Sequence, residues 1–197
     1  MTEITKGVRE KLIAKYFEIK REFDFTPLYE NLLYADIAYT EVGAKDLVDA
    51  FLQFFCLHAV KEDGGMYPNP IGVVDEVYHT FILNDTEAYF AFCKRFFGEE
   101  IHHVHRTACD NLTEEHYGEF LERVAYTSHL LQGAYGAILH PLLSEWIEEC
   151  ERLSVLSFAE REQEAKRARI KRLIHMARHY AHEASALMET QWAPRVE

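Results

Sequence analysis

The stretch at residues 73–98, VVDEVYHTFILNDTEAYFAFCKRFFG, decides the fold class of this chain. Its apolar residues recur at helical spacing, which places them on one face of a helix from about Val73 and on one face of a second helix over 86–97. Asp85 is a good turn residue between the two, and Gly98 suits the position after a helix end. The stretch therefore predicts two consecutive α-helices.

The same helical periodicity extends toward the N-terminus, for example at Leu12, Tyr16 and Ile19. Residues 61–72, KEDGGMYPNPIG, concentrate Gly, Pro and Asn and predict an irregular loop. No strand-like alternation and no internal repeat interrupts this pattern. The expected fold is all-α, a single compact helical domain with a long C-terminal helix.

Helix boundaries are also predicted for the second half of the chain. A helix is expected from about Leu112, with Thr113 as its N-cap and with Gly133 and Gly136 after its end. Pro141 is expected to open the following helix, because proline is well tolerated at the first helical position.

The chain divides into two segments of different composition. Residues 1–153 are expected to form the helical core domain, and residues 154–197 the long C-terminal helix and tail, which Ser157 and Glu160 would open as a capping box. The tail carries few apolar residues among many charges, so we expect it to bind a protein partner or a second copy of the chain.

Net charge and cysteine spacing limit the function classes. The 33 acidic and 21 basic residues give a formal charge of −12, which disfavours general binding to nucleic acid or anionic lipid. The first residues lack the continuous apolar run of a signal peptide or membrane span. Cysteines are widely spaced, without a CxxC pair, which is typical of reduced thiols and a cytoplasmic location. They stand at Cys56, Cys93, Cys109 and Cys150.

Asp75, His79, His102 and His103 form the strongest candidate site. Residues four apart on a helix project in the same direction, so Asp75 and His79 can offer an oxygen and a nitrogen to one ion, and a histidine of the IHH pair can complete the set. Two imidazoles and one carboxylate suit an open Zn(II) site or a non-haem Fe(II) site. In an extended segment neighbouring side chains point to opposite sides, which favours His103 over His102 as the third ligand.

Structural explanations exist for the same residues. Asp75 could accept a hydrogen bond from His79 or cap the helix start, and the paired histidines could be surface residues. His105 is expected to face solvent. Cys93 could be a nucleophile beside His79, but its phenylalanine-rich surroundings favour a buried, inert thiol.

VDEVYHTFIL, AYFAFC and GEEIHH together resemble the signature of the glycine-rich domain-containing protein-like family, over about residues 47–146. Tyr78 stands where that family usually has tryptophan, the segment LNDTEAY is one residue longer, and His105 replaces a usual proline. The resemblance implies a small helical domain with a metal-like Asp/His cluster and without a defined activity. The matching positions are Asp75, His79, Thr80, Cys93, Gly98, His102 and His103.

The sequence supports two hypotheses of different classes. In the first, the chain holds a divalent metal ion, Zn or Fe, and is a hydrolase or oxidoreductase of undefined substrate, with Glu76 or Tyr78 supporting the ligands. In the second, the Asp/His cluster is a metal-free hydrogen-bond network in an interaction module whose C-terminal helix binds a partner. Whether the chain is an enzyme is open.

Two motifs of the tail stay outside the main site. His175, His179 and His182 recur on one helical face without a carboxylate or thiolate beside them, which favours a solvated or packing face. The run KRARIKR at 166–172 concentrates positive charge, which suits an acidic partner or nucleic acid. A solvated helix with i,i+4 pairs such as Glu162 with Lys166 explains the same run, and the lack of interleaved aromatic residues argues against single-stranded nucleic acid.

Overall fold

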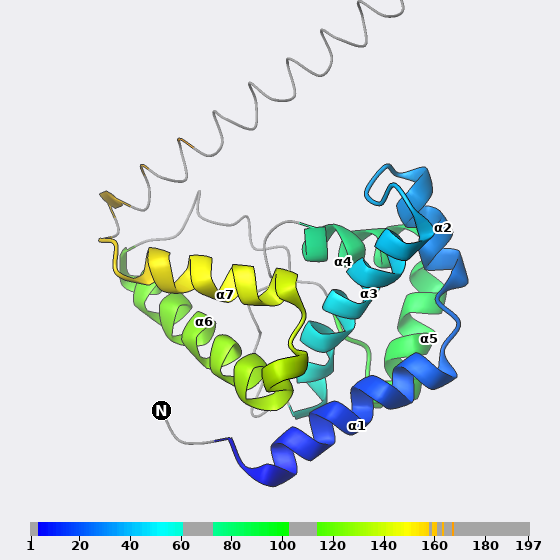
Figure 1. Ribbon diagram of the computed structural model, residues 1–197, viewed down its shortest axis with the longest axis horizontal. Helices are drawn as coiled ribbons and strands as arrows, with labels where there is room; N and C mark the ends of the chain where they lie inside the picture. Colours follow the sequence, from blue (N-terminus) through cyan, green and yellow to red (C-terminus); the bar gives the residue numbers. More distant parts are fainter. Residues whose placement is uncertain are drawn as a thin grey trace, which may run out of the picture.

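The structure is a computed structural model that describes residues 4–60, 73–102 and 114–157, with a few isolated positions up to 167. Within these ranges the chain is helical and contains no strand (Figure 1). The helices are α1 (Lys6–Glu22), α2 (Thr26–Tyr34), α3 (Glu41–Phe55), η1 (Cys56–Val60), α4 (Val73–Asn84), α5 (Thr86–Phe97), α6 (Glu114–Tyr135), η2 (Gly136–Ile138) and α7 (Pro141–Ser154). The all-α prediction is confirmed.

Helix α3 lies at the centre of the molecule. Figure 1 shows α2, α4 and α5 on one side of it and the α6–α7 pair on the other, with α1 running along both groups. The second half of α3 is buried around its whole circumference, from Phe51 through Phe55. A helix that is covered on every face belongs to the core, which explains the near-continuous apolar sequence of this segment.

Helix α1 buries a single stripe. The residues predicted to face inward, Leu12, Tyr16 and Ile19, are all buried, and the helix packs against η1 and α6. Thr5 caps the N-terminus by accepting a hydrogen bond from the backbone N–H of Val8 at 3.4 Å. The amphipathic pattern of α1 therefore predicts both that the helix forms and which of its faces is buried.

Helices α4 and α5 form a tight helical hairpin. Asp85 is the single residue between them, and its side chain accepts a hydrogen bond from the N–H of Ala88 at 2.8 Å, so it caps α5. Gly98 adopts the left-handed conformation, with φ of 81°, that ends α5 without strain. Both boundaries agree with the prediction.

A cluster of phenylalanine rings joins α1 to this hairpin. Phe23, which follows α1, lies 4.8 Å from Phe92 of α5 between ring centroids, and Phe81 of α4 lies 5.3 Å from Phe92. Phe25 adds a ring 4.7 Å from Phe23. Edge-to-face and tilted arrangements of this kind add to the burial energy of each ring.

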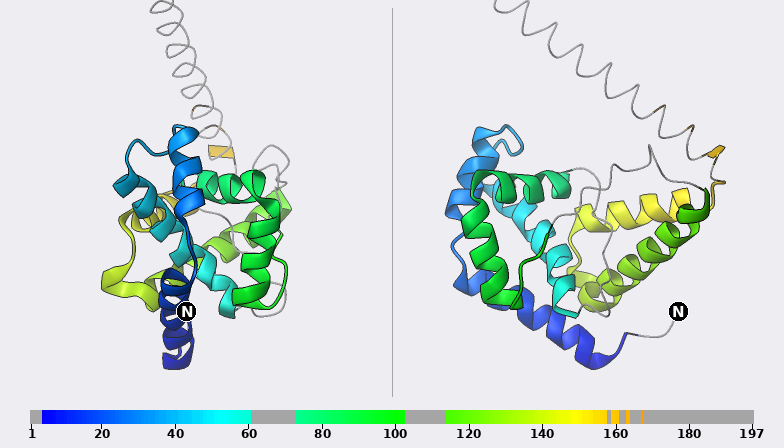
Figure 2. Two further views of the ribbon diagram at one scale, coloured as in Figure 1. Left: turned by 90° about the vertical axis from the view of Figure 1, so that its right-hand side faces the viewer. Right: turned by 180° about the vertical axis from the view of Figure 1, so that it is seen from behind.

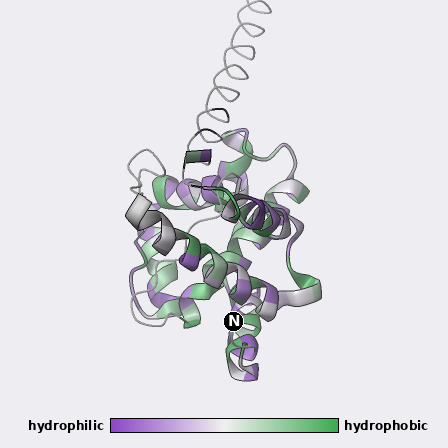
Figure 3. Ribbon diagram, turned by 90° about the vertical axis from the view of Figure 1, so that its left-hand side faces the viewer, coloured by the Kyte–Doolittle hydropathy of each residue, from purple (hydrophilic) through white to green (hydrophobic). Residues whose placement is uncertain are grey.

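Helices α6 and α7 pack as an antiparallel pair, which the right-hand view of Figure 2 shows from behind. In Figure 3, which is coloured by hydropathy, hydrophilic and hydrophobic residues share the same helices. Pro141 opens α7 as predicted. The predicted end of α6 before Gly133 is wrong, because the helix continues to Tyr135. Gly133 is instead a packing residue: a Cβ there would overlap the side chain of Ile4. Gly136, with φ of 50°, starts η2 just beyond the true end.

The capping box after α7 is present. The Ser157 hydroxyl accepts a hydrogen bond from the Glu160 N–H at 3.4 Å, and the Glu160 carboxylate accepts from the Ser157 N–H at 2.9 Å. Isolated positions up to 167 are helical. Most of the predicted long C-terminal helix, with His175, His179 and His182, lies outside the described residues.

Candidate metal centre

Asp75 and His79 lie one helical turn apart on the flank of α4. Their nearest atoms, Asp75 Oδ2 and His79 Nδ1, are 3.8 Å apart, and the two side chains are 27% and 30% exposed. Val77 and Tyr78, on the adjacent face, are buried. The predicted juxtaposition of carboxylate and imidazole at the edge of the core is therefore confirmed, and 3.8 Å is longer than a hydrogen bond.

His102 has a different environment. It follows α5 and its side chain is 67% exposed, with Nε2 at 3.7 Å from Glu100 Oε2. The imidazole also packs on the ring of Phe90, with centroids 5.4 Å apart. Its polar and ring contacts are thus with Glu100 and Phe90, which were not predicted as its neighbours.

The complete predicted ligand set cannot be assembled from the described part of the chain. His103 and His105 lie outside it, and within residues 4–60, 73–102 and 114–157 no group of three or more His, Cys, Asp or Glu side chains is arranged to hold a metal ion. The structure therefore brings Asp75 and His79 together and places His102 elsewhere in the described ranges, beside Glu100.

A buried chain of hydroxyl groups fixes the segment that leads to the histidine pair. The Tyr89 hydroxyl donates a hydrogen bond to the carbonyl of Ile101 at 2.6 Å, and its oxygen lies 3.0 Å from the Tyr78 hydroxyl. Because the Tyr89 proton is used on Ile101, the Tyr78 hydroxyl donates to Tyr89. The backbone immediately before His102 is thereby tied to α4, the helix that carries Asp75 and His79.

Burial also sets the protonation of this network. It raises the pKa of Tyr78 and that of Tyr89 well above the ordinary value for tyrosine, so both hydroxyls are neutral donors. Burial likewise raises the pKa of the Cys93 thiol, and contacts with Tyr89 and the Ile101 backbone oppose this rise only in part. Cys93 is buried, as predicted, and a thiol with a raised pKa is a poor nucleophile.

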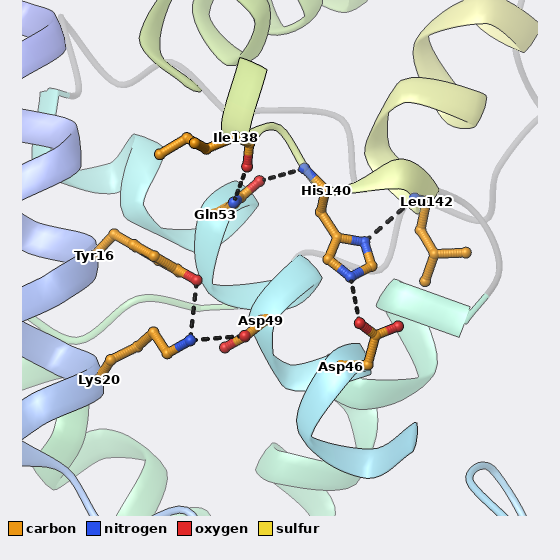
Figure 4. A network of polar contacts seen from close by, with 8 residues as sticks. All are labelled: Tyr16, Lys20, Asp46, Asp49, Gln53, Ile138, His140 and Leu142. Atoms are coloured by element: carbon orange, nitrogen blue, oxygen red, sulfur yellow. Dashed lines mark hydrogen bonds and ion pairs between the residues drawn. The ribbon is translucent and has the colours of Figure 1, made fainter. Parts of the chain in front are cut away.

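A second Asp/His pair, which no local sequence pattern predicted, lies between α3 and α7 (Figure 4). His140 Nε2 is 3.1 Å from Asp46 Oδ1, and His140 Nδ1 accepts a hydrogen bond from the backbone N–H of Leu142 at 3.2 Å. An accepting Nδ1 requires the neutral tautomer with its proton on Nε2, which then donates to Asp46. His140 is therefore the N-cap of α7, and both of its ring nitrogens are used.

Gln53 completes this junction. Its amide nitrogen donates to the carbonyl of Ile138 at 2.8 Å, and its amide oxygen accepts from the N–H of His140 at 2.8 Å. The side chain is buried, so the amide satisfies two main-chain groups of the connection between η2 and α7. Two features of the sequence point to this junction: a glutamine within the apolar run AFLQFFCL and a histidine directly before Pro141.

Lys20 forms a third polar group, where α1 packs beside α3, also drawn in Figure 4. Its ammonium donates to Asp49 Oδ2 at 2.7 Å and to the Tyr16 hydroxyl at 3.2 Å. Burial lowers the pKa of Lys20, but the hydrogen bonds to Asp49 and Tyr16 outweigh this and raise it overall. The pair joins α1 to α3 as a charged, structural contact.

Fold and site together define a class of helical proteins with a carboxylate–imidazole pair at the core edge. More particularly, the chain belongs to the UCP032817-like family, whose model matches residues 9–127, more than half of the sequence. This range contains most of α1, all of α2 to α5 and most of α6, including Asp75 and His79. The family description names no activity. Comparisons with curated proteins and with solved structures gave no match. In the described part of the chain, no helix has the length and hydropathy needed to span a bilayer.

Proposed function

We propose that this protein binds one divalent metal ion through Asp75, His79 and His103. The observation that carries the proposal is the 3.8 Å approach of the Asp75 carboxylate to the His79 imidazole on a rigid helix, with about a third of each side chain open to solvent. A carboxylate and an imidazole that already converge on one side of a helix lose little freedom when they bind an ion.

Further support comes from the anchoring of the next segment. Tyr89 holds the Ile101 carbonyl at 2.6 Å, so the backbone that enters the histidine pair begins from a fixed point. The resemblance of this region to the glycine-rich domain-containing protein-like family adds to the proposal, since Asp75, His79 and His103 fall on its signature positions.

The ligand types limit the chemistry. In such a set Zn(II) supplies activated water for hydrolysis, whereas Fe(II) supplies a position for O₂ in an oxidation. Asp75 contributes the charge that favours a cation, and His79 contributes a nitrogen ligand, which must be neutral to bind. Glu76, beside Asp75 on the exposed side of α4, is the nearest additional carboxylate in sequence.

Titration calorimetry of untagged full-length protein tests the proposal, with Zn(II), Mn(II) and, under anaerobic conditions, Fe(II). We expect one site per chain and a loss of affinity of about 100-fold or more in His79→Ala and His103→Ala. His105→Ala is the matched control and should keep most of the affinity. Wild-type protein that binds none of these ions would contradict the proposal, as would equal binding by His79→Ala.

The second candidate is a metal-free interaction module in which the Asp/His cluster is a structural hydrogen-bond network. The position of His102 favours it, because this imidazole lies on Phe90 and beside Glu100. Elemental analysis of untagged protein separates the candidates, since stoichiometric metal is expected only for the first. Under this alternative Asp75→Asn would change stability and leave metal content at background.

We also propose that the protein acts in the cytoplasm and contacts a protein partner, or a second copy, through residues 154–197. The described cysteines are free thiols, with Cys56 and Cys93 in the core, which suits a reducing compartment. The formal charge of −12 supports a protein partner over nucleic acid.

A further inference from the structure

The corner between α2 and α3 exposes an unusual amount of apolar surface. Tyr34 at the end of α2 is 93% exposed, Tyr39 just before α3 is 88% exposed, and Val42 in the first turn of α3 is 78% exposed. We call these three residues the α2–α3 corner. Large side chains exposed this close together mark interaction surfaces more often than isolated ones do.

The backbone of this corner is held in one conformation. The N–H groups of Ile37 and Ala38 both donate to the Leu32 carbonyl, at 3.0 Å and 3.1 Å. Asp36 takes the left-handed conformation that the turn needs, with φ of 55°, and Thr40 caps α3. The exposed rings therefore project from a fixed turn, which lowers the ordering cost of binding.

The sequence around the corner is acidic. The continuous stretch 24–46 contains five carboxylates and one basic residue, and that base, Lys45, is paired with Glu41. The surface therefore combines apolar rings with excess negative charge, which fits an amphipathic basic segment. The carboxylates are Asp24, Glu30, Asp36, Glu41 and Asp46.

This chain contains a segment with the complementary composition. Residues 166–176, KRARIKRLIHM, carry five Lys and Arg side chains, and Ile170, Leu173 and Met176 recur among them every third position. Residues 166–176 therefore complement the α2–α3 corner both in hydrophobicity and in charge.

We propose that the α2–α3 corner docks residues 166–176 of a second copy of the chain. This rests on the proposed contact through residues 154–197 and is independent of the metal proposal. Figures 1 and 2 show α7 ending on the side of the molecule opposite α2, with the Ser157 cap only nine residues before position 166. In a two-fold dimer, residues 166–176 of each chain contact the α2–α3 corner of the other chain, so neither segment has to cross its own molecule. The same contact then forms twice.

Sedimentation velocity of the full chain tests this at low and high salt. Wild type should be dimeric at low salt and dissociate as salt rises, because the contact is partly electrostatic. A corner variant, Tyr34→Ser with Tyr39→Ser, should weaken dimerisation at least about tenfold. Leu83→Ser, at a position on α4 that is 78% exposed, is the control and should leave the dimer intact. Because the replaced rings are exposed, the melting temperature should stay close to that of wild type.

A mixing experiment identifies the two halves of the contact. A segment variant, Arg167→Glu with Arg169→Glu and Lys171→Glu, should be monomeric alone. Mixed with the corner variant it should regain association, because the corner of one chain and the segment of the other are intact. A monomeric wild type overturns the proposal, and so does a dimer that the corner variant leaves unchanged or a mixture that stays monomeric. Failure here leaves metal binding by Asp75 and His79 untouched, so the two proposals are separable.

Discussion

This fold contains two Asp/His pairs, one at a buried helix junction and one on the partly exposed flank of a helix. At the α3–α7 junction, His140 is 9% exposed and uses Nε2 on Asp46 and Nδ1 on the Leu142 N–H. On α4, the His79 side chain is 30% exposed and stands 3.8 Å from Asp75. The comparison shows that an aspartate beside a histidine does not define a function. Geometry and solvent access decide whether the imidazole holds a helix end or can receive a ligand.

The largest stability effect is expected at the buried junction. Gln53→Leu keeps the volume of the side chain but leaves the Ile138 carbonyl and the His140 N–H buried without their hydrogen bonds. We expect a loss of about 2–4 kcal/mol of unfolding free energy, measured by urea denaturation. Metal binding at α4 should be unchanged, because Gln53, Ile138 and His140 are not ligands of the proposed site. A loss below about 1 kcal/mol would show that water replaces the amide.

A smaller effect is expected in the tyrosine network. Tyr89→Phe removes the hydroxyl that binds Ile101 and receives the Tyr78 proton, which should cost about 1–3 kcal/mol. Unlike Gln53→Leu, it should also weaken metal binding, because the segment before the histidine pair loses its anchor. Tyr78→Phe is the control, since it leaves the Tyr89–Ile101 bond in place. Identical metal affinity in Tyr89→Phe and wild type would separate this network from the site.

His140 variants test the cap alone. His140→Ala should cost about 1–2 kcal/mol through loss of the cap on α7, whereas His140→Asn should cost less, because its side-chain oxygen can accept from the Leu142 N–H. Thermal unfolding of the two variants side by side gives the difference. Equal destabilisation would mean that the Asp46 contact, and not the cap, dominates.

Truncation after Leu156 should have the smallest effect on stability. It removes Ser157, whose contacts with Glu160 are local and solvent-exposed, and leaves every described helix from α1 to α7 complete. We expect a folded helical protein whose unfolding stays cooperative and whose self-association is altered. Loss of a cooperative melting transition would show that the tail completes the core.

Local sequence information was sufficient for much of the fold. The α4–α5 hairpin follows from apolar periodicity, the Asp85 cap and Gly98, all within one stretch of sequence. The end of α6 could not be predicted in this way, because Gly133 packs against the side chain of Ile4, which is distant in the sequence. Likewise, Gln53 and His140 are 87 positions apart, and no local pattern connects them.

The candidate site likewise has one part that local spacing predicts and one part that depends on how the helices pack. Asp75 and His79 share one helix, so their proximity is a local property that spacing predicts. The environment of His102 depends on Phe90 and Glu100, and the hydroxyl bond between Tyr78 and Tyr89 joins two helices. Such contacts depend on how the helices pack, which residue spacing alone does not specify.

The most direct test of the distinction between the two Asp/His pairs is the metal content of three untagged proteins after zinc loading and dialysis. We predict one zinc per chain in wild type and in His140→Asn, and background zinc in His79→Gln. Acidification through roughly pH 6 should release the zinc, because ligand imidazoles must be neutral. Background zinc in wild type, or equal zinc in His79→Gln and wild type, would contradict the account and assign both Asp/His pairs to structure.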